Sequence, residues 1–194
     1  MTLSLNNLTF IIVTFKSDHI INECIESLPK DSNIIIIENS NNLELKKKLE
    51  AKYSKINVIV QENSGMGSAN NKGIKLCKTN YAFIINPDVK FYENTMHELI
   101  TLSFKYNDYS ILAPISDDAK YPNYKIKNKK IKNDDPDFLN VDSVDGYAML
   151  INKNRFNDNV FFDENFFLYL ENDDLCLSKK KENNKIYVAR KAKI

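Results

Sequence analysis

The sequence is short of several features, and each shortage excludes a class of protein. Only 3 of its 194 residues are cysteines, and Cys24, Cys77 and Cys176 lie far apart. This number and spacing exclude a disulfide framework and a cysteine zinc cluster, and they favour a reducing compartment. The formal net charge is +1. No overall field therefore attracts nucleic acid or a membrane surface, and we predict no nucleic-acid partner.

Long hydrophobic runs are also missing. The longest runs, 8–15 and 34–37, are far shorter than the roughly 20 apolar residues that a membrane-spanning helix needs. The N-terminus lacks the basic region and the small-residue cleavage site of a secretory signal. We therefore predict a cytoplasmic protein, and peripheral contact with the cytoplasmic face of a membrane stays open.

The residues that are present predict an α/β fold. With 43% hydrophobic and 27% charged residues, the chain has an ordinary globular composition, and its length predicts one domain. Apolar, β-branched runs alternate with amphipathic segments, which favours a mostly parallel central sheet with helices on both faces. Ser17 or Asp18 is expected to cap the first helix. The predicted strands are 8–15, 34–37, 56–60, 81–85 and 111–115, and the predicted helices are 18–28, 43–53, 64–78 and 93–106.

The second half of the chain begins differently. The segment 117–140 is polar and contains two prolines, so we interpret it as a long surface excursion with, at most, a short ribbon. Its basic run, 125–132, is typical of a solvated loop, although contact with an anionic acceptor or a lipid headgroup stays open. The remaining predicted elements are a strand at 141–152, an aromatic segment at 161–170, a helix at 171–181 and a strand at 185–189.

Polar residues at the ends of the predicted strands are the first candidates for a site, because doubly wound sheets bind ligands beyond the carboxyl ends of their strands. Glu38 directly follows the second strand. Its carboxylate could accept hydrogen bonds from ribose hydroxyls or from a base N–H. The alternative is a purely structural turn in which Ser40 or Asn41 caps the next helix.

A glycine-containing turn follows the third strand. Half of the chain's 4 glycines, Gly65 and Gly67, lie in this turn, at the start of the segment 63–73. Glycine permits a positive φ and a close backbone approach, and the N-terminus of the following helix attracts phosphate. The spacing matches neither a Walker loop nor a dinucleotide fingerprint, so the turn alone is a weak signal.

The fourth strand ends in Asn86-Pro87-Asp88. A carboxylate beyond the sheet edge suits Mg²⁺ or Mn²⁺ bridging a diphosphate, because both ions take oxygen ligands. Asn86 could contact a nucleotide directly or through water. The alternative is an ordinary Asx-Pro turn without a function.

Acidic residues open the last predicted helix, in Glu171-Asn172-Asp173-Asp174. Three carboxylates beside an aromatic segment suggest a lined cleft in which a carboxylate acts as general base. The alternative is that these acids only stabilise the helix N-terminus through its dipole. We interpret His19 and His97 as surface residues, and no nucleophile elbow is present.

Six segments, in this order, resemble the family 2 glycosyltransferases, especially their rhamnosyltransferase-like branch. The resemblance covers nearly the whole chain, and although each motif is modest, the ordered set is specific. The matching segments are Ile12-Val13-Thr14-Phe15, Glu38-Asn39-Ser40, the turn from Asn63 to Asn71, Asn86-Pro87-Asp88-Val89, Gly146-Tyr147-Ala148-Met149-Leu150-Ile151, and the stretch from Phe162 through Tyr169 to Cys176.

The resemblance implies a single GT-A domain over 1–194, with a nucleotide-sugar-binding half at 1–116 and an acceptor-side half at 117–194. It also implies a UDP- or dTDP-linked sugar donor, a glycan or lipid-linked acceptor, a Mg²⁺ or Mn²⁺ ion on Asp88, and inversion at the anomeric carbon. Glu171, Asp174 or Asp173 would be the general base. The residues implied in nucleotide-sugar binding are Thr14, Phe15, Glu38, Asn63, Gly65, Gly67, Asn70, Asn71, Asn86, Asp88 and Gly146.

Two departures from the family pattern keep alternatives open. Asn172 stands where the family often has Asp, and the chain stops at Ile194, where the family usually continues. Glu171 is then the favoured base, with Asp174 second, in a trimmed or compact variant. The main alternative is a catalytically impaired nucleotide-sugar or glycan-binding remnant. A nucleotidyltransferase is the other alternative. It would require a basic, glycine-rich signature near the first strand, and Lys16-Ser17-Asp18 does not provide one.

Overall fold

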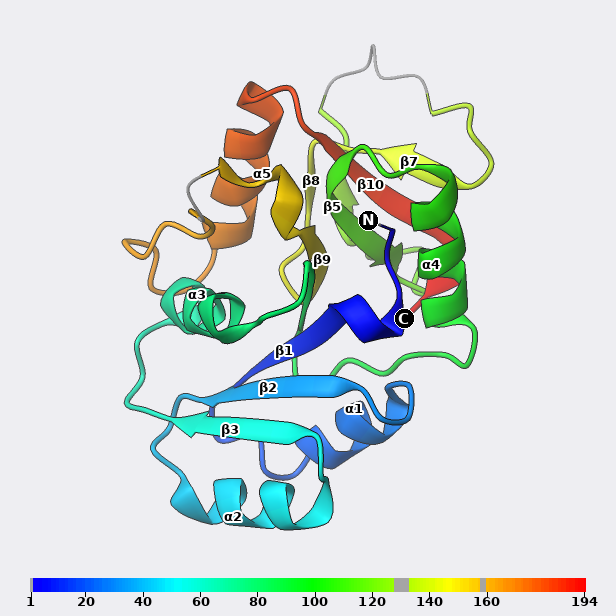
Figure 1. Cartoon of the computed structure of the whole chain (residues 1–194). Helices are drawn as coiled ribbons and strands as arrows, with labels where there is room; N and C mark the ends of the chain where they lie inside the picture. The colour runs from blue at the N-terminus through cyan, green and yellow to red at the C-terminus, as the bar shows by residue number, and fades with distance from the viewer. Residues whose placement is uncertain (1, 128–132, 158–159) are drawn as a thin grey trace.

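A central eight-stranded sheet organises the chain in a computed structural model that describes residues 2–127, 133–157 and 160–194 (Figure 1). The strand order within the described residues is β3-β2-β1-β4-β9-β5-β10-β7. The strands are β1 (Leu8–Thr14), β2 (Asn33–Glu38), β3 (Ile56–Val60), β4 (Tyr81–Ile85), β5 (Tyr109–Ile115), β7 (Phe138–Asn140), β9 (Ala148–Asn152) and β10 (Lys185–Lys193). A two-stranded ribbon pairs β6 (Tyr124–Lys125) with β8 (Ser143–Val144).

Helices cover both faces of the sheet, as the sequence predicts. Apolar residues alternate along the buried strands, so that Phe10 and Ile12 join one core cluster while Ile11 and Val13 join the other. Residues of α1, α2 and α4 complete the first cluster, and residues of α3 and α5 complete the second. The helices are α1 (Ile21–Ser27), α2 (Leu43–Lys52), α3 (Met66–Leu76), α4 (Thr95–Lys105) and α5 (Glu171–Lys181), with short 3-10 turns η1 (Leu5–Asn7) and η2 (Lys153–Arg155).

The parallel strands bring their carboxyl ends to one edge. β1 pairs in parallel with both β2 and β4, and Thr14 lies opposite Glu38 in this register. All seven residues of β1 are buried, because the strand lies inside the sheet with helices over both faces. The antiparallel strand β9 lies between β4 and β5, so its first residue, Ala148, lies opposite Ile85 at the end of β4. The start of β9 therefore contributes to the same edge of the sheet.

The start of the first predicted helix is wrong by a few residues, whereas the second helix begins at Leu43 as predicted, and the predicted caps of both helices are wrong. The first helix begins at Ile21, because the backbone N–H groups of Ile20 and Ile21 both bond to the Ser17 carbonyl in a preceding turn. Neither Ser17 nor Asp18 caps the helix. The second helix is capped by Asn42, whose side-chain oxygen accepts a 2.9 Å hydrogen bond from the backbone of Leu45. Ser40 and Asn41 therefore do not serve as its cap.

In the second half of the chain, the predicted bounds of two strands are wrong. The predicted strand 141–152 is divided into β8 and β9, because the chain turns between Asp145 and Tyr147. The last strand runs on to Lys193, where it pairs in parallel with β5, and its other edge pairs with β7. Residues 128–132 of the basic run lie outside the described residues. No helix in the described part of the chain is long and apolar enough to cross a membrane.

Candidate active site

A cavity of about 380 Å³ lies at the carboxyl edge of β1 and β4, beside the N-terminus of α3. We call it the Phe15 cavity. It brings together five residues predicted for the site, which are Phe15, Asn63, Gly65, Asn86 and Asp88. Its other lining residues are Val13, Ser17, Ile20, Asn39, Met66, Pro87, Phe167 and Leu168.

Phe15 offers a planar face in this cavity. It directly follows β1, and 49% of its surface is exposed although it lines a hollow. The ammonium group of Lys16 lies 5.4 Å from the centre of its ring. An exposed aromatic ring at a strand end can stack on a flat heterocycle, because every nucleobase presents a π-face.

Glu38 and Asn39 lie differently with respect to the Phe15 cavity, because only Asn39 lines it. Glu38 is completely buried, and its carboxylate accepts backbone hydrogen bonds from Ser40 at 3.0 Å and Asn42 at 2.5 Å. It therefore orders the turn after β2 and does not reach the cavity surface. Asn39, which sequence reasoning passed over in favour of the neighbouring charge, lines the cavity and donates a 2.9 Å hydrogen bond to Asn63.

The backbone of Phe167, distant in the sequence, packs against the turn before α3. Gly65 has a φ of +84°, and a Cβ there would lie 2.5 Å from the carbonyl oxygen of Phe167. That same oxygen accepts a 2.8 Å hydrogen bond from the backbone of Met66. Glycine is thus required by both the conformation and the close approach. One N–H at the start of α3, where the sequence suggests phosphate binding, is already used by the protein.

Four other predicted residues do not line the Phe15 cavity. Asn71 clamps the backbone of Phe162, accepting a 3.0 Å hydrogen bond from its N–H and donating one of 2.8 Å to its carbonyl. Gly67 lets α3 pack against the same segment, since an added Cβ would lie 3.3 Å from the Phe162 side chain. Thr14 and Asn70 are buried, and each carries a side-chain oxygen without a hydrogen-bond partner in the described structure.

Asn86 and Asp88 form the rim of the cavity after β4. The backbone N–H of Asn86 donates a 2.9 Å hydrogen bond to the carbonyl of Tyr147, which fixes the end of β4 against the start of β9. Asp88 is exposed, and within the described residues no hydrogen bond or ion pair occupies its carboxylate. Nearby, burial raises the pKa of Cys24 to about 12, and the charge of Asp88 adds to the effect.

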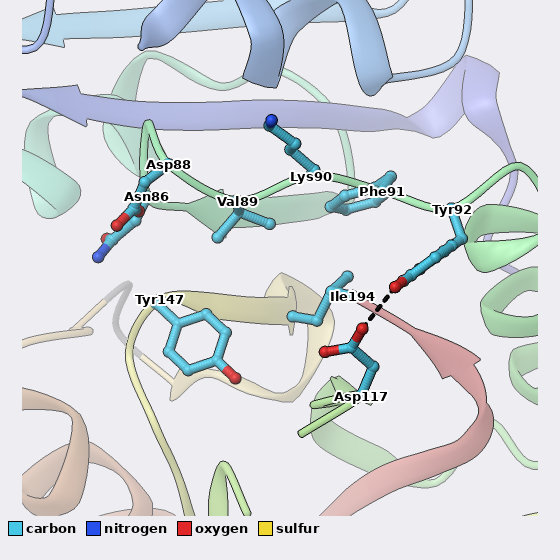
Figure 2. Close-up of a pocket in the computed structure, with 9 residues that line it drawn as sticks. All are labelled: Asn86, Asp88, Val89, Lys90, Phe91, Tyr92, Asp117, Tyr147 and Ile194. Atoms are coloured by element: carbon cyan, nitrogen blue, oxygen red, sulfur yellow. Dashed lines mark hydrogen bonds between the residues drawn. The ribbon is translucent and has the colours of Figure 1, made fainter. Parts of the chain in front are cut away.

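A second cavity, of about 610 Å³, shares Asn86 and Asp88 with the first (Figure 2). We call it the Tyr147 cavity. Sequence reasoning missed its polar residues Tyr92, Asp117 and Tyr147. Two of them had a usable signal, because Asp117 closely follows β5 and Tyr147 follows the predicted residue Gly146. The other lining residues are Val89, Lys90, Phe91 and Ile194.

The predicted general bases line neither of these cavities. Asp173 and Asp174 line a third cavity, and Asp173 pairs with Lys125 at 2.6 Å. Burial opposes the ionisation of Asp173, but hydrogen bonds from Lys125 and Ser143 prevail and hold its pKa below the ordinary value. Glu171 is 6% exposed, and its Oε2 has no hydrogen-bond partner within the described residues. None of these three cavities therefore joins Asp88 with the acids of α5.

Packing explains where the first turn of α5 lies. An added Cβ at Gly67 would lie 3.6 Å from the Glu171 side chain, so Glu171 faces α3. An added Cβ at Gly146 would lie 3.3 Å from Asn172, whose amide donates a 2.9 Å hydrogen bond to the carbonyl of Val144. Gly146 therefore admits Asn172 next to the start of β9, one residue before Tyr147.

The described residues are compatible with a divalent cation that takes one ligand from the protein and its other ligands from the substrate and water. The described residues contain no group of three or more His, Cys, Asp or Glu side chains that could hold a metal ion. Mg²⁺ commonly binds through one or two carboxylates together with substrate phosphates and water. Asp88 meets this requirement, because its carboxylate is exposed and no described residue bonds to it.

The fold and the edge cavity define a GT-A type α/β domain. The sequence model of glycosyl transferase family 2 matches residues 9–174, and the chain belongs to this family. One curated relative is the low-salt glycan biosynthesis hexosyltransferase Agl10 of Haloferax volcanii, which is 24% identical over 197 residues. The match covers 92% of this chain and 63% of Agl10, so the chain spans less than two thirds of that relative.

Solved structures agree with this fold. Residues 1–349 of S. aureus TarS in complex with UDP superpose with a TM-score of 0.69 at 16% identity, over 97% of this chain and 60% of TarS. GalNAc-T7 with UDP, GalNAc and Mn²⁺ gives a TM-score of 0.76 at 14% identity, over 94% of this chain and 41% of GalNAc-T7. Both are GT-A glycosyltransferases, and at these identities the similarity establishes the fold alone.

Proposed function

We propose that this chain is the donor-binding and catalytic part of an inverting glycosyltransferase. It would move a hexose-type sugar from a UDP- or dTDP-linked donor to a glycan or lipid-linked acceptor in cell-envelope or surface polysaccharide synthesis. Transfer to a lipid-linked acceptor would place it at the cytoplasmic face of a membrane, which is part of the same proposal. The rhamnosyltransferase-like branch stays a prediction.

One observation carries this proposal: the Phe15 cavity combines an exposed aromatic ring with the carboxylate of Asp88, which no described residue engages. The ring suits a nucleobase, and Asp88 suits a cation on the diphosphate. Asn39 and Asn63 line the same cavity. The family membership and the UDP complexes of structurally similar proteins support a nucleotide as the ligand.

The proposed reaction is a direct displacement. A base removes the proton of an acceptor hydroxyl, the hydroxyl oxygen bonds to the anomeric carbon, and the nucleoside diphosphate leaves with the electron pair of the broken bond. A Mg²⁺ or Mn²⁺ ion on Asp88 would stabilise the negative charge of the departing diphosphate. Glu171 stays the proposed base, with Asp174 second, because Asp173 is held by Lys125 and the Glu171 carboxylate has an oxygen without a partner among the described residues.

A binding module without transfer activity is the second candidate. Asn172 occupies the position beside Gly146, and none of the three acids of α5 lines either cavity that contains Asp88. Such a module would bind the donor through the same Phe15 cavity but would neither hydrolyse nor transfer its sugar.

Calorimetry with UDP and dTDP, each with and without Mn²⁺, tests the proposed function. We expect binding of at least one nucleotide that strengthens with Mn²⁺. Absence of binding by both nucleotides under all conditions would contradict the proposal. Donor turnover, measured as release of UDP from UDP-sugars, then separates the enzyme from the binding module.

A further inference from the structure

We propose that Gln61 and Lys72 are positioning residues that fix which end of the Asn63 amide faces the Phe15 cavity. This inference rests on the proposed function, because it gives that amide a nucleobase to bind. Neither Gln61 nor Lys72 lines the cavity, and both act through Asn39 and Asn63, which do line it. We call these four residues the amide network.

The amide network joins three segments of the chain, which are the turn after β2, the turn after β3 and helix α3. Gln61 directly follows β3, and its backbone N–H donates a 2.9 Å hydrogen bond to the carbonyl of Glu38 at the end of β2. The Lys72 ammonium on α3 donates a 2.6 Å hydrogen bond to the side-chain oxygen of Gln61. The side-chain nitrogen of Gln61 donates to Asn39 Oδ1 at 2.8 Å and to Ser64 Oγ at 2.7 Å.

The direction of these hydrogen bonds is fixed by groups that can only donate. An ammonium group has no acceptor, so the side-chain oxygen of Gln61 faces Lys72 and its NH₂ group faces Asn39. The backbone N–H of Ser64 donates to the same Asn39 oxygen at 3.2 Å, which assigns that oxygen independently. The amides of Gln61 and Asn39 therefore each have one orientation that satisfies their neighbours.

The amide of Asn39 is used completely within the protein. Its nitrogen donates to Asn63 Oδ1 at 2.9 Å and to the carbonyl of Gly65 at 3.4 Å, while its oxygen accepts the two hydrogen bonds just described. An amide side chain has two N–H donors and two lone pairs on its oxygen. Asn39 therefore lines the cavity without a free hydrogen-bonding group for a ligand.

Asn63 is left with its NH₂ group for a ligand. Its oxygen accepts from Asn39 at 2.9 Å and from the backbone N–H of Gly65 at 3.1 Å, and no described residue accepts a hydrogen bond from its nitrogen. The network therefore presents a donor to the cavity. A donor suits a carbonyl oxygen, and the bases of UDP and dTDP each carry carbonyl acceptors. Because the amide is already oriented without a ligand, binding does not have to order it.

A double-mutant cycle separates positioning from a general effect on the fold. Gln61→Leu removes the central link, and we expect it to weaken UDP binding in Mn²⁺ by about threefold to thirtyfold in calorimetry. In the Asn63→Ala background the same substitution should change the affinity by less than about twofold, because the group that it positions is gone. Equal effects in the two backgrounds would show that Gln61 acts only on the structure, and would overturn the proposal.

The lysine gives a second test with a rescue. Lys72→Met removes the ammonium group and should weaken UDP binding by about twofold to tenfold, whereas Lys72→Arg keeps a donor and should restore most of the affinity. Lys75→Met is the matched control on α3, because Lys75 pairs with Glu164 at 3.7 Å and lies outside the cavity. Thermal melts establish that each variant is folded before titration. Lys72→Met with the affinity of the control, or Lys72→Arg as weak as Lys72→Met, would overturn the role of the lysine.

Failure of the amide network is distinct from failure of the proposed function. If wild type binds UDP, but Gln61→Leu and Lys72→Met bind it as wild type does, the network is wrong and the proposed function stands. If wild type binds neither UDP nor dTDP, both are overturned.

Discussion

The backbone N–H of Asn86 donates a 2.9 Å hydrogen bond to the carbonyl oxygen of Tyr147. This bond joins the end of a parallel strand to the start of an antiparallel strand, at the edge where ligands of such sheets bind. The Phe15 cavity and the Tyr147 cavity meet at Asn86 and Asp88. Ligands bound in the two cavities would therefore lie side by side across a single strand end.

Asp88→Asn should abolish the effect of Mn²⁺ on UDP binding. The carboxylate is exposed and has no partner among the described residues, so its replacement should leave the fold unchanged while it removes the cation's protein ligand. The measurement is UDP affinity by calorimetry with and without Mn²⁺, and Asp118→Asn is the control. Mn²⁺ enhancement that persists in Asp88→Asn would show that another residue binds the cation.

Phe15→Ala should weaken UDP binding by about fivefold to a hundredfold, because stacking of one base on an aromatic ring contributes about 1–3 kcal/mol. Phe104→Ala is the matched control, since Phe104 is 77% exposed and lies outside the cavity. Fluorescence competition or calorimetry gives both dissociation constants. Equal affinities for the two variants would place the base elsewhere.

Glu171→Gln should lower the turnover of the donor by about a hundredfold to ten-thousandfold, the usual contribution of a general base, and leave UDP affinity unchanged. Asp173→Asn is the comparison, because Asp173 is already paired with Lys125. If only Asp174→Asn shows the loss, the base is Asp174. If wild type has no turnover with any donor and acceptor pair tested, the binding module is favoured.

Gly65→Ala should destabilise the protein. The new side chain would have to adopt a φ of +84° and approach the Phe167 carbonyl to 2.5 Å. A strained backbone of this kind costs about 1–3 kcal/mol, which for a chain of this size lowers Tm by roughly 2–12 °C. Ser64→Ala is the control in the same turn. A thermal melt of Gly65→Ala that coincides with the control would contradict the close contact.

The cysteines should be unreactive in the folded protein at pH 8. Burial raises the pKa of Cys24 and of Cys176 to about 12, so neither is a thiolate at that pH, and Cys77 is also buried. Because the folded pKa is above the ordinary value, these thiols favour the folded state below about pH 9, and the benefit is lost as pH rises toward 12. Thiol labelling with and without urea measures this. Rapid labelling without urea would contradict the burial.

The sequence predicts the strands on either side of the site well, for a physical reason. Runs such as Ile34–Ile37 are apolar at every position, which only a strand covered on both faces tolerates. The polar residues that follow these strands are then confined to one edge. This rule places Asn86 and Asp88 at the edge where the Phe15 cavity lies, whereas Phe15 itself is predicted only through the resemblance to the glycosyltransferase family.

Other features depend on contacts that no local pattern contains. Glu38 has the type and position of a ligand-binding carboxylate, yet two backbone N–H groups of the following turn engage it. The insertion of β9 between β4 and β5 is decided by long-range pairing. Tyr92, Asp117 and Tyr147 come from three separate segments, so their meeting in one cavity follows from topology and not from spacing.

A crystal structure of the protein with UDP and Mn²⁺ tests the central claim most directly. We predict that the uracil stacks on Phe15, that a cation bridges the diphosphate and Asp88, and that the terminal phosphate points toward the Tyr147 cavity. Nucleotide bound away from the Phe15 cavity, or a cation held by other side chains than Asp88, would contradict the account.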